Sequence, residues 1–396
     1  MLKGIKVVSF THYLQGPSAV QMLADAGAEV VKIEPPKGAF ERHWSGHDAF
    51  LDGVSVFFLL ANRNQRSISL DLRSEEGKAI ALKLIGEADV LVENYRPRVL
   101  DKLGFGYEAM KALNPGLVYC SCTGYGSDGP YVQRPGQDLL LQAMSGLAML
   151  SGDGDRAPVG VGSAIVDQHA AILAAFGVTA ALLARQHSGL GRRVESNLLN
   201  AALDLQIEPF NYYLNKGELW PRSTPAMGSR FHPAPYGIYR TADGWIAISL
   251  SAMEPLSAAF DEPELKDYSK HDQSYKREEI HARIAKLLLG KGTEQWFAIF
   301  TEHGIWHAPV NDYAQVEQDP QVQWNRSIVE FDYPRAGKVR LLNHPLRYDG
   351  EVPPLRRPPP LHGEHSREIL EELGYDAEAI DALLQRAVVI GAEEPR

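Results

Sequence analysis

Cysteine is scarce in this sequence, where only Cys120 and Cys122 occur among 396 residues. Two cysteines this close together in a strand-like run form neither a disulfide framework nor a metal-binding pattern. Such usage is typical of a reducing compartment, and we expect the protein to be cytoplasmic.

Positive charge and long apolar runs are also lacking. The net charge of −10 argues against nonspecific binding of nucleic acid, which needs a basic face. The longest apolar run, residues 170–184, is shorter than the roughly 18 to 20 residues that span a bilayer. We therefore expect a buried core helix there and no membrane partner. The start, MLKGIKVVSF, is interrupted by charges and predicts a first strand, not a signal peptide.

The signatures of several common enzyme classes are missing. No G-x-G-x-x-G follows the first predicted strand and no P-loop occurs, which argues against a nicotinamide dinucleotide enzyme. No G-x-S-x-G is present, which argues against a serine hydrolase. The pairs His43/His47 and His303/His307 have the i,i+4 spacing of metal ligands, but each encloses a glycine and lacks a third ligand, so no metal site is predicted.

What is present is an alternation of strand and helix signals in the first half, which predicts a parallel α/β sheet. Runs rich in β-branched and apolar residues predict strands over residues 5–10, 29–34, 67–72, 90–94 and 117–122. Helices are predicted between them over residues 17–26 and 74–87, the second opened by a capping Ser74. At 396 residues with 44% hydrophobic content, the chain is long enough for two domains.

The second half is more varied. Residues 208–230 are aromatic and predict an irregular segment, as a linker or an interface would be, and residues 235–250 predict a hairpin that turns at Ala242-Asp243-Gly244. Helical patterns follow over residues 278–289 and 293–303, and a long proline-rich connection begins near residue 315. Two last helices are predicted over residues 366–373 and 377–386.

Cations occur beyond the predicted strand ends, which is the edge where parallel α/β sheets bind ligands. They could hold the phosphates of a nucleotide-like ligand, because guanidinium groups match phosphate oxygens, or they could be solvated surface charges. The residues are Lys37, Arg73, Arg96, Arg98, Lys102 and Arg134.

Asp167 follows the small-residue run GVGSAIV, predicted as a strand, and opens a long apolar helix. It could be a plain N-cap of that helix, or a nucleophile that accepts an acyl group and then coenzyme A. The two roles are compatible, because a helix N-terminus favours the ionised carboxylate.

Ten segments in order resemble the class III coenzyme A transferases, the family that includes formyl-CoA transferase, carnitine CoA-transferase and α-methylacyl-CoA racemase. They are GIKVVSFTHYLQGP, GAEVVKIEPPKG, NRNQRSISLDLRSEEG, DVLVENYRPRVLDKLGFGY, LNPGLVYCSCTGYGSDGPY, RPGQDLLLQAMSGL, HSGLGRRVESNLLNAAL, PYGIYRTADGWIAI, APVNDYAQVEQDPQV and PLHGEHSREILEELG. The resemblance covers nearly the whole chain.

The resemblance implies a Rossmann-like large domain built from both termini, a small α+β domain, and an obligate, interlaced, ring-like homodimer. Applied to this sequence, it places the large CoA-binding domain at residues 1–200, completed by residues 330–396. A linker over residues 201–225, a small domain over residues 226–312 and a return linker over residues 313–329 lie between these parts.

By resemblance, Asp167 is the nucleophile and Asp138 an acidic residue beside the active site. No permanently bound cofactor is implied, since coenzyme A and its acyl thioesters are substrates. The positions that match the family's CoA contacts are His12, Tyr13, Leu14, Gln15, Lys37, Leu70, Arg73, Asn94, Tyr95, Lys102 and Arg134.

Two departures from the family bear on the substrate. The racemase branch has a proton-relaying histidine where this chain has Gln137, which cannot relay a proton, although His12 or His169 could substitute. The tetraglycine lid of formyl-CoA transferase is replaced by AMGSRFHPAPYG, which puts an oxalate/formate pair in doubt.

The expected activity is transfer of CoA from a donor such as succinyl-CoA to a carboxylic acid acceptor. A racemase or epimerase of the same fold and a non-catalytic CoA-binding protein are the alternatives. Residues expected near the substrate are Gln137, His43, Arg230 and His232.

Overall fold

A computed structural model describes residues 1–225 and 227–392. Its strands are β1 (Lys6–Phe10), β2 (Glu29–Glu34), β3 (Phe50–Leu51), β4 (Val54–Ser55), β5 (Gln65–Leu70), β6 (Val90–Glu93), β7 (Val118–Thr123), β8 (Arg193–Asn197), β9 (Gly237–Arg240), β10 (Trp245–Ile248), β11 (His307–Pro309), β12 (Ile328–Tyr333), β13 (Gly337–Leu342) and β14 (Val389–Ile390). Its α-helices are α1 (Gln15–Asp25), α2 (Val56–Leu59), α3 (Glu75–Gly86), α4 (Val99–Leu103), α5 (Tyr107–Leu113), α6 (Asp138–Met144), α7 (Ile165–Ser188), α8 (Leu198–Asp204), α9 (Ile207–Lys216), α10 (Met253–Phe260), α11 (Lys270–Tyr275), α12 (Arg277–Leu288), α13 (Thr293–Glu302), α14 (Tyr313–Gln318), α15 (Pro320–Trp324), α16 (Ser366–Glu372) and α17 (Ala377–Gln385).

A seven-stranded sheet organises the first part of the chain, with strand order β14-β5-β2-β1-β6-β7-β8. All neighbouring pairs are parallel except β14, which runs antiparallel to β5. The five strands predicted from the sequence are β1, β2, β5, β6 and β7, and α1 and α3 are the predicted helices between them. The expectation of a mixed α/β fold around a mainly parallel sheet is thus confirmed.

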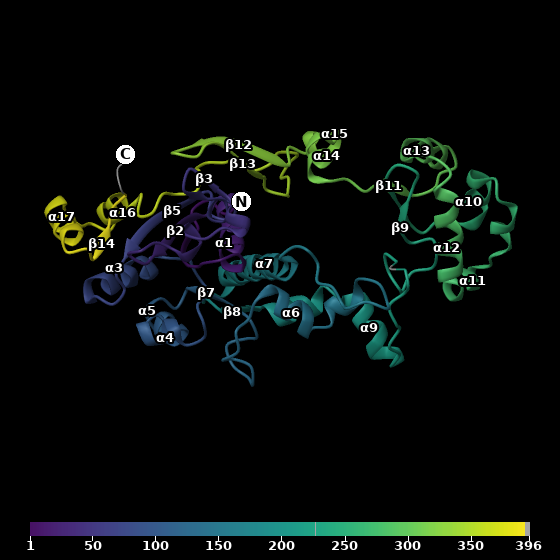
Figure 1. The fold of residues 1–396 in the computed structure, drawn as a ribbon. Coiled ribbons are helices and arrows are strands. Elements are labelled where there is room, and N and C mark those ends of the chain that lie inside the picture. The colour runs from purple at the N-terminus through teal and green to yellow at the C-terminus, as the bar shows by residue number, and fades with distance from the viewer. Residues whose placement is uncertain (226, 393–396) are drawn as a thin grey trace. The chain divides into compact units, whose positions relative to one another are not determined.

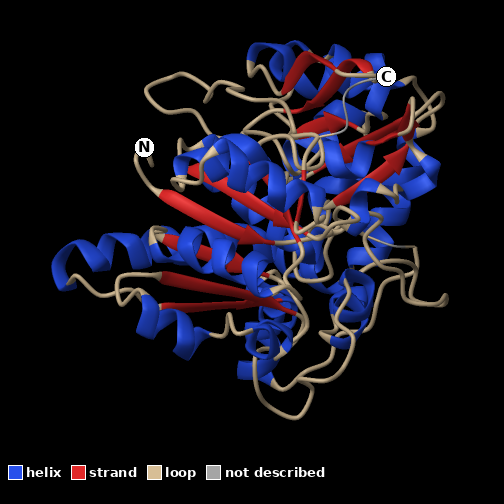
Figure 2. Ribbon diagram, turned by 90° about the vertical axis from the view of Figure 1, so that its left-hand side faces the viewer, coloured by secondary structure: helices blue, strands red, loops and turns tan. Residues whose placement is uncertain are grey.

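Helices cover both faces of this sheet (Figure 2). Because side chains alternate along a strand, Val90 and Val92 of β6 face α1 and α7, whereas Leu91 packs on the face covered by α3, α16 and α17. The side chain of Glu93, two residues after Leu91, therefore lies on the opposite face of the sheet from α7. The sheet separates two sets of side chains that are close in sequence.

Helix α7 is the long apolar helix, and it extends the predicted run to 24 residues. By length and composition it could cross a membrane, although 44% of its apolar window is buried. It packs on α1, β7 and β8, with residues such as Ala171 and Val178 in the core. This packing agrees with a core helix.

The carboxyl-terminal segments complete the same unit. Strand β14 joins the sheet, and α16 and α17 cover β5 (Figure 1). A buried ionic group fastens the hairpin β12–β13: the Arg63 guanidinium pairs with Asp25 at 2.7 Å and donates to the Leu342 carbonyl at 2.6 Å. His344 lies 3.3 Å from the same aspartate.

Contacts divide the chain into two compact units: unit 1 comprises Met1–Leu141, Ala164–Leu205 and Pro320–Arg396, and unit 2 comprises Gln142–Ser163 and Gln206–Asp319. Unit 2 contains the predicted hairpin as β9 and β10, with β11 added antiparallel to β10. The predicted helices are α12 and α13, which bury Ile280, Ile284 and Trp296 in a separate core. The predicted domain limits stay a prediction, and the predicted start of the small domain, residue 226, lies outside the described residues.

Three local predictions were wrong. The supposedly irregular segment after residue 207 contains helix α9, which buries no residue in this chain, so its aromatic side chains give no core pattern. The long return carries the hairpin β12–β13, whose small core includes Tyr333 and Val339. The run GVGSAIV before Asp167 is not a strand: it is extended chain that enters α7 directly.

Candidate active site

Asp167 lies in the first turn of α7 as its third residue, and its side chain is half-buried. It is not the N-cap, because that position is Ala164, which makes no side-chain capping hydrogen bond. The prediction that Asp167 caps the helix is therefore wrong. Its carboxylate also receives no hydrogen bond from any residue that the structure describes, so its lone pairs are free.

Asp138 performs the capping from outside the helix. Its Oδ2 accepts the backbone N–H of Val166 at 2.7 Å and that of Asp167 at 3.0 Å. These two donors have no partner within the helix, and a carboxylate is also favoured by the helix dipole. Asp138 thus fixes the backbone at the point where Asp167 projects.

A close backbone approach brings Asp138 to this place. Gly124, directly after β7, and Gly136, two residues before Asp138, pack against each other, and a Cβ on Gly136 would lie 2.5 Å from the Gly124 Cα. Any side chain at either position would push the two segments apart. The pair of glycines ties the loop that carries Asp138 to the end of the sheet.

The pKa of Asp167 is raised to about 7, first by burial and then by the negative charge of Asp138. The expectation that the helix N-terminus keeps this carboxylate ionised is therefore wrong, because Asp138 already occupies the helix N–H groups. Near neutral pH, protonated and ionised forms of Asp167 coexist. The ionised form is a stronger nucleophile than an ordinary aspartate, since a higher pKa means a more basic oxygen.

The segment between β1 and α1 forms the neighbouring wall. The Asn94 side chain fixes this segment by bonding both backbone groups of His12. Its Oδ1 accepts the His12 N–H at 2.9 Å and its Nδ2 donates to the His12 carbonyl at 2.7 Å. The rings of His12 and Tyr95 meet edge to face at 4.6 Å. The structure thus brings together His12, Asn94 and Tyr95, which the resemblance assigns to CoA.

Burial lowers the pKa of His12 to about 4, with a smaller opposing effect of Glu41. The imidazole is therefore neutral at physiological pH. Gln15 opens α1 and is 6% exposed, and its buried Nε2 has no hydrogen-bond partner among the described residues. An orphaned buried donor of this kind is available to a ligand.

The first turns of α1 and α7 are linked directly. The Gln168 Nε2 donates to the Ser18 Oγ at 3.3 Å, so the residue after Asp167 contacts the helix that begins with Gln15. The start of α1, which follows β1, and the start of α7, which precedes β8, therefore lie at the same edge of the sheet. Sequence reasoning did not identify either residue, because neither has a recognisable motif.

A buried ion pair supports the β1–α1 segment from below, and it too was missed. The Lys32 Nζ donates to the Thr11 carbonyl at 2.6 Å and pairs with Glu41 at 3.3 Å, and both side chains are fully buried. The other oxygen of Glu41 accepts the Tyr13 N–H at 3.3 Å, where Tyr13 has a φ of 60°. A lysine inside a strand-like apolar run was the available signal.

The remaining predicted CoA contacts are less closely grouped. Leu14 is buried at the start of α1, and the Leu70 side chain is fully buried in the core at the end of β5. Arg73 is exposed and makes a two-pronged ion pair with Asp71 at 2.9 and 3.0 Å. Lys37, Lys102 and Arg134 are exposed, with the Arg134 guanidinium 3.9 Å above the Tyr131 ring.

The residues predicted near the substrate are divided between the two units of the chain. Gln137 is exposed beside Asp138, and the His43 ring nitrogen bonds the Lys37 carbonyl at 2.7 Å. Arg230 and His232 belong to unit 2, where Arg230 donates to the carbonyls of Trp220 and Met149. His232 stacks on Tyr236 at 4.5 Å.

Proton and metal chemistry have little support at this site. His169 is committed to Asp204 at 2.7 Å on the neighbouring helix α8. No group of three metal-ligating side chains is found in residues 1–225 and 227–392. What the arrangement offers is a free, basic carboxylate beside a fixed helix start, which is suited to nucleophilic attack on an activated carbonyl.

Comparison with known proteins agrees with this geometry. Residues 2–366 match the family described as CoA-transferase family III. Succinyl-CoA:glutarate CoA-transferase of Mus musculus is 34% identical over 98% of this chain and 90% of its own, and succinyl-CoA–D-citramalate CoA-transferase of Chloroflexus aurantiacus is 32% identical over 98% of both. A crystal structure of a CAIB/BAIF family protein from Brucella suis superposes with a TM-score of 0.82 at 31% identity, covering 94% of this chain and 98% of that one. The protein is therefore an enzyme of CoA-transferase family III.

Proposed function

We propose that this enzyme moves coenzyme A from an acyl-CoA donor to a carboxylic acid acceptor through a thioester formed on Asp167. The observation that carries the proposal is the free carboxylate of Asp167, which has a raised pKa and accepts no hydrogen bond from the described residues. A carboxylate used only for structure would normally be bonded when it is this deeply placed.

The proposed reaction consists of four nucleophilic substitutions at acyl carbons, and each step releases one leaving group. The Asp167 carboxylate attacks the donor thioester carbonyl, which forms a mixed anhydride and releases CoA thiolate. The thiolate attacks the aspartyl carbonyl of the anhydride, which forms aspartyl-CoA and releases the donor acid. The acceptor carboxylate attacks aspartyl-CoA to give a second anhydride and thiolate. The thiolate then attacks the acceptor carbonyl, which releases the new acyl-CoA and regenerates Asp167.

Asp138 and the β1–α1 segment have distinct roles in this scheme. Asp138 holds the Asp167 backbone through two hydrogen bonds and raises the basicity of its carboxylate. The segment from His12 to Gln15, fixed by Asn94, forms a wall for the CoA thioester, and the Gln15 amide supplies an unpaired donor. The scheme needs neither a metal ion nor a resident cofactor.

For the substrates we propose succinyl-CoA as donor and a dicarboxylic acid as acceptor. Two relatives that align over nearly the whole chain are named for transfer from succinyl-CoA to glutarate and to D-citramalate. The assignment of Arg230, His232 and His43 to the substrate stays a prediction from the sequence.

We also propose that the enzyme works as a cytoplasmic, interlaced homodimer. Helix α9 buries no side chain within its own chain and exposes Ile207 by 65% and Leu214 by 61%. Phe176 of α7 is 71% exposed. Apolar side chains at these levels on two helices are typical of surfaces that a partner covers. Light scattering at micromolar concentration should give twice the 43.8 kDa chain mass, and a monomer would refute the dimer.

Trapping tests the covalent step. Wild-type enzyme incubated with succinyl-CoA and then hydroxylamine should yield a hydroxamate on the peptide that contains Asp167, detected by mass spectrometry. Asp167→Asn should yield none, and Asp204→Asn, which alters another aspartate of the same unit, should react like the wild type. Turnover without any adduct would overturn the proposal. Incorporation of deuterium at the α-carbon of a 2-methylacyl-CoA without acceptor would instead identify a racemase.

A further inference from the structure

A cavity lies on the opposite face of the sheet from Asp167. It has a volume of about 340 Å³ and is enclosed by the ends of β6, β7 and β8 and by α4 and α5. Glu93 at its floor follows Leu91 on the face away from α7. Volumes of about 300 Å³ and above are typical of small-molecule sites, so this one suits a small ligand.

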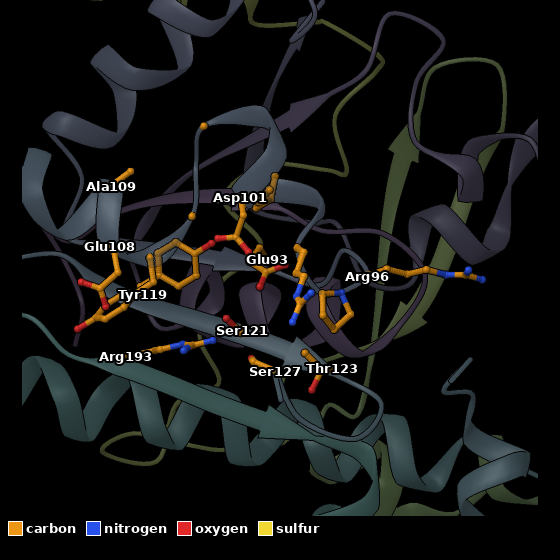
Figure 3. Close-up of a pocket in the computed structure, with 16 residues that line it drawn as sticks. Glu93, Arg96, Asp101, Glu108, Ala109, Tyr119, Ser121, Thr123, Ser127 and Arg193 are labelled. Carbon is orange, nitrogen blue, oxygen red and sulfur yellow. The ribbon is translucent and has the colours of Figure 1, made fainter. Parts of the chain in front are cut away.

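Charges of both signs line the cavity, and no ion pair joins its carboxyl groups to Arg98 or Arg193 among the described residues. Figure 3 shows the carboxyl groups of Glu93 and Asp101 together at its centre, with Arg193 reaching in from β8. Asp101 has no hydrogen-bond or ion-pair partner among the described residues, and the Arg98 guanidinium has none either. Arg193 makes an exposed ion pair with Glu195 at 3.1 Å, a contact of little energetic weight, and its guanidinium lies 5.6 Å from the centre of the Tyr107 ring.

The backbone is adapted to present these groups. Arg98 has a φ of 69° at the start of α4, a left-handed backbone conformation that residues other than glycine rarely adopt. A Cβ on Gly106 would lie 1.9 Å from the Asp101 Oδ1, so a side chain at this position would displace that carboxylate. Tyr107 and Tyr119 meet edge to face at 5.7 Å and give the cavity an aromatic wall.

We infer that this cavity binds a small zwitterion, with its ammonium group at Glu93 and Asp101 and its carboxylate at Arg98 and Arg193. A dianion would bring a negative group against two carboxyls, and a dication would bring a positive group against two guanidinium groups. A ligand with one charge of each sign can pair each charge with a lining group of opposite sign, and the aromatic wall suits the chain between the two charges. The site is separate from the transferase chemistry and does not depend on it.

The environment of Glu93 adds a pH signature. Burial raises its pKa to about 7, opposed by hydrogen bonds from the Ser121 hydroxyl and the Tyr95 N–H and by the charge of Arg193, and assisted by Asp101. A bound ammonium group favours the ionised carboxyl. Affinity for the zwitterion should therefore rise from about pH 6 to about pH 8, since Glu93 is already ionised in a larger fraction of the molecules at the higher pH.

Three five-carbon probes test the inference by calorimetry on the full chain: 5-aminopentanoate, glutarate and pentane-1,5-diamine. We expect saturable binding of 5-aminopentanoate that weakens at least about tenfold in Asp101→Asn and in Arg193→Gln. Arg192→Gln is the matched control, because Arg192 does not line this cavity, and it should bind like the wild type. Asp101 and Arg193 are exposed, so both variants should fold.

The dicarboxylate and the diamine identify the ligand class. Any heat from glutarate should be the same in the wild type and in Asp101→Asn, which assigns it to another site. The inference is overturned if 5-aminopentanoate does not bind the wild type, or if its binding is equal in all variants. It is also overturned if the wild type binds the diamine as tightly as 5-aminopentanoate and the Asp101→Asn variant no longer binds the diamine.

Discussion

Two carboxyl groups on opposite faces of one sheet, the half-buried Asp167 and the buried Glu93, have the same raised pKa of about 7 but different surroundings. Burial is the largest cause in both cases. Glu93 accepts hydrogen bonds from the Ser121 hydroxyl and the Tyr95 N–H, whereas Asp167 accepts none from the described residues. A raised pKa alone therefore does not identify a nucleophile. The free lone pairs beside a fixed helix start distinguish Asp167.

The largest expected effect separates the two groups directly. Asp167→Asn should lower transferase turnover by at least about 10³-fold, because the amide cannot form the covalent intermediate. Glu93→Gln should lower it by no more than about threefold, because glutamine still offers an oxygen to the Tyr95 N–H. Initial rates with succinyl-CoA and glutarate measure both. Equal losses in the two variants would remove the distinction.

The pH dependence of the covalent step should follow the ionisation of Asp167. In the proposed reaction only the ionised form of Asp167 attacks, so the rate of hydroxamate trapping should fall about tenfold per pH unit well below about pH 7 and level off above it. Single-turnover trapping between about pH 5 and about pH 8.5 checks this. A flat profile in that range would show that Asp167 does not titrate as described.

Asp138 should set the position of that profile. Asp138→Asn keeps an oxygen for the Val166 and Asp167 N–H groups but removes the charge, so the pKa of Asp167 should fall and the acid limb move by on the order of one pH unit to lower pH. Asp138→Ala also removes the cap and should cost about 1 kcal/mol of unfolding free energy, measured by urea denaturation. If the limb stays in place in Asp138→Asn, Asp138 acts only through the backbone.

The smallest effect is one the two groups should share. Both carboxyls bind a proton more tightly in the folded chain, so each lowers stability as pH rises from about 4 to about 7, and the penalty is fully present above that. Asp167→Asn and Glu93→Gln should each raise the melting temperature by roughly 2–4 °C at pH 8, and by less at pH 5. Calorimetry at both pH values checks the sign. A larger gain at pH 5 would contradict the raised pKa values.

Much of the fold could be predicted because its strands are short β-branched runs bounded by turn residues. The runs at β1, β2 and β6 needed no tertiary information, and Ser74 marked the start of α3 correctly. Helix α9 could not be found this way, since it buries no residue in its own chain and shows no core-facing pattern.

The candidate site was only partly accessible from the sequence. Asp167 stood out as an acid before an apolar run, but its role as a cap was wrong because the capping group, Asp138, comes from 29 residues earlier. That contact depends on the Gly124–Gly136 approach, which no local pattern specifies. Likewise, the support of Thr11 and Tyr13 by Lys32 and Glu41 exists only in the folded chain.

Oxygen transfer tests the central claim most directly. In the proposed reaction, the acceptor carboxylate leaves one of its oxygens on Asp167 in each turnover. Enzyme that turns over succinyl-CoA with glutarate labelled by ¹⁸O in both carboxylates, in ordinary water, should gain about 2 Da on the peptide containing Asp167 in the first turnover. Glutaryl-CoA formed at full rate while that peptide remains unlabelled would contradict covalent catalysis by Asp167.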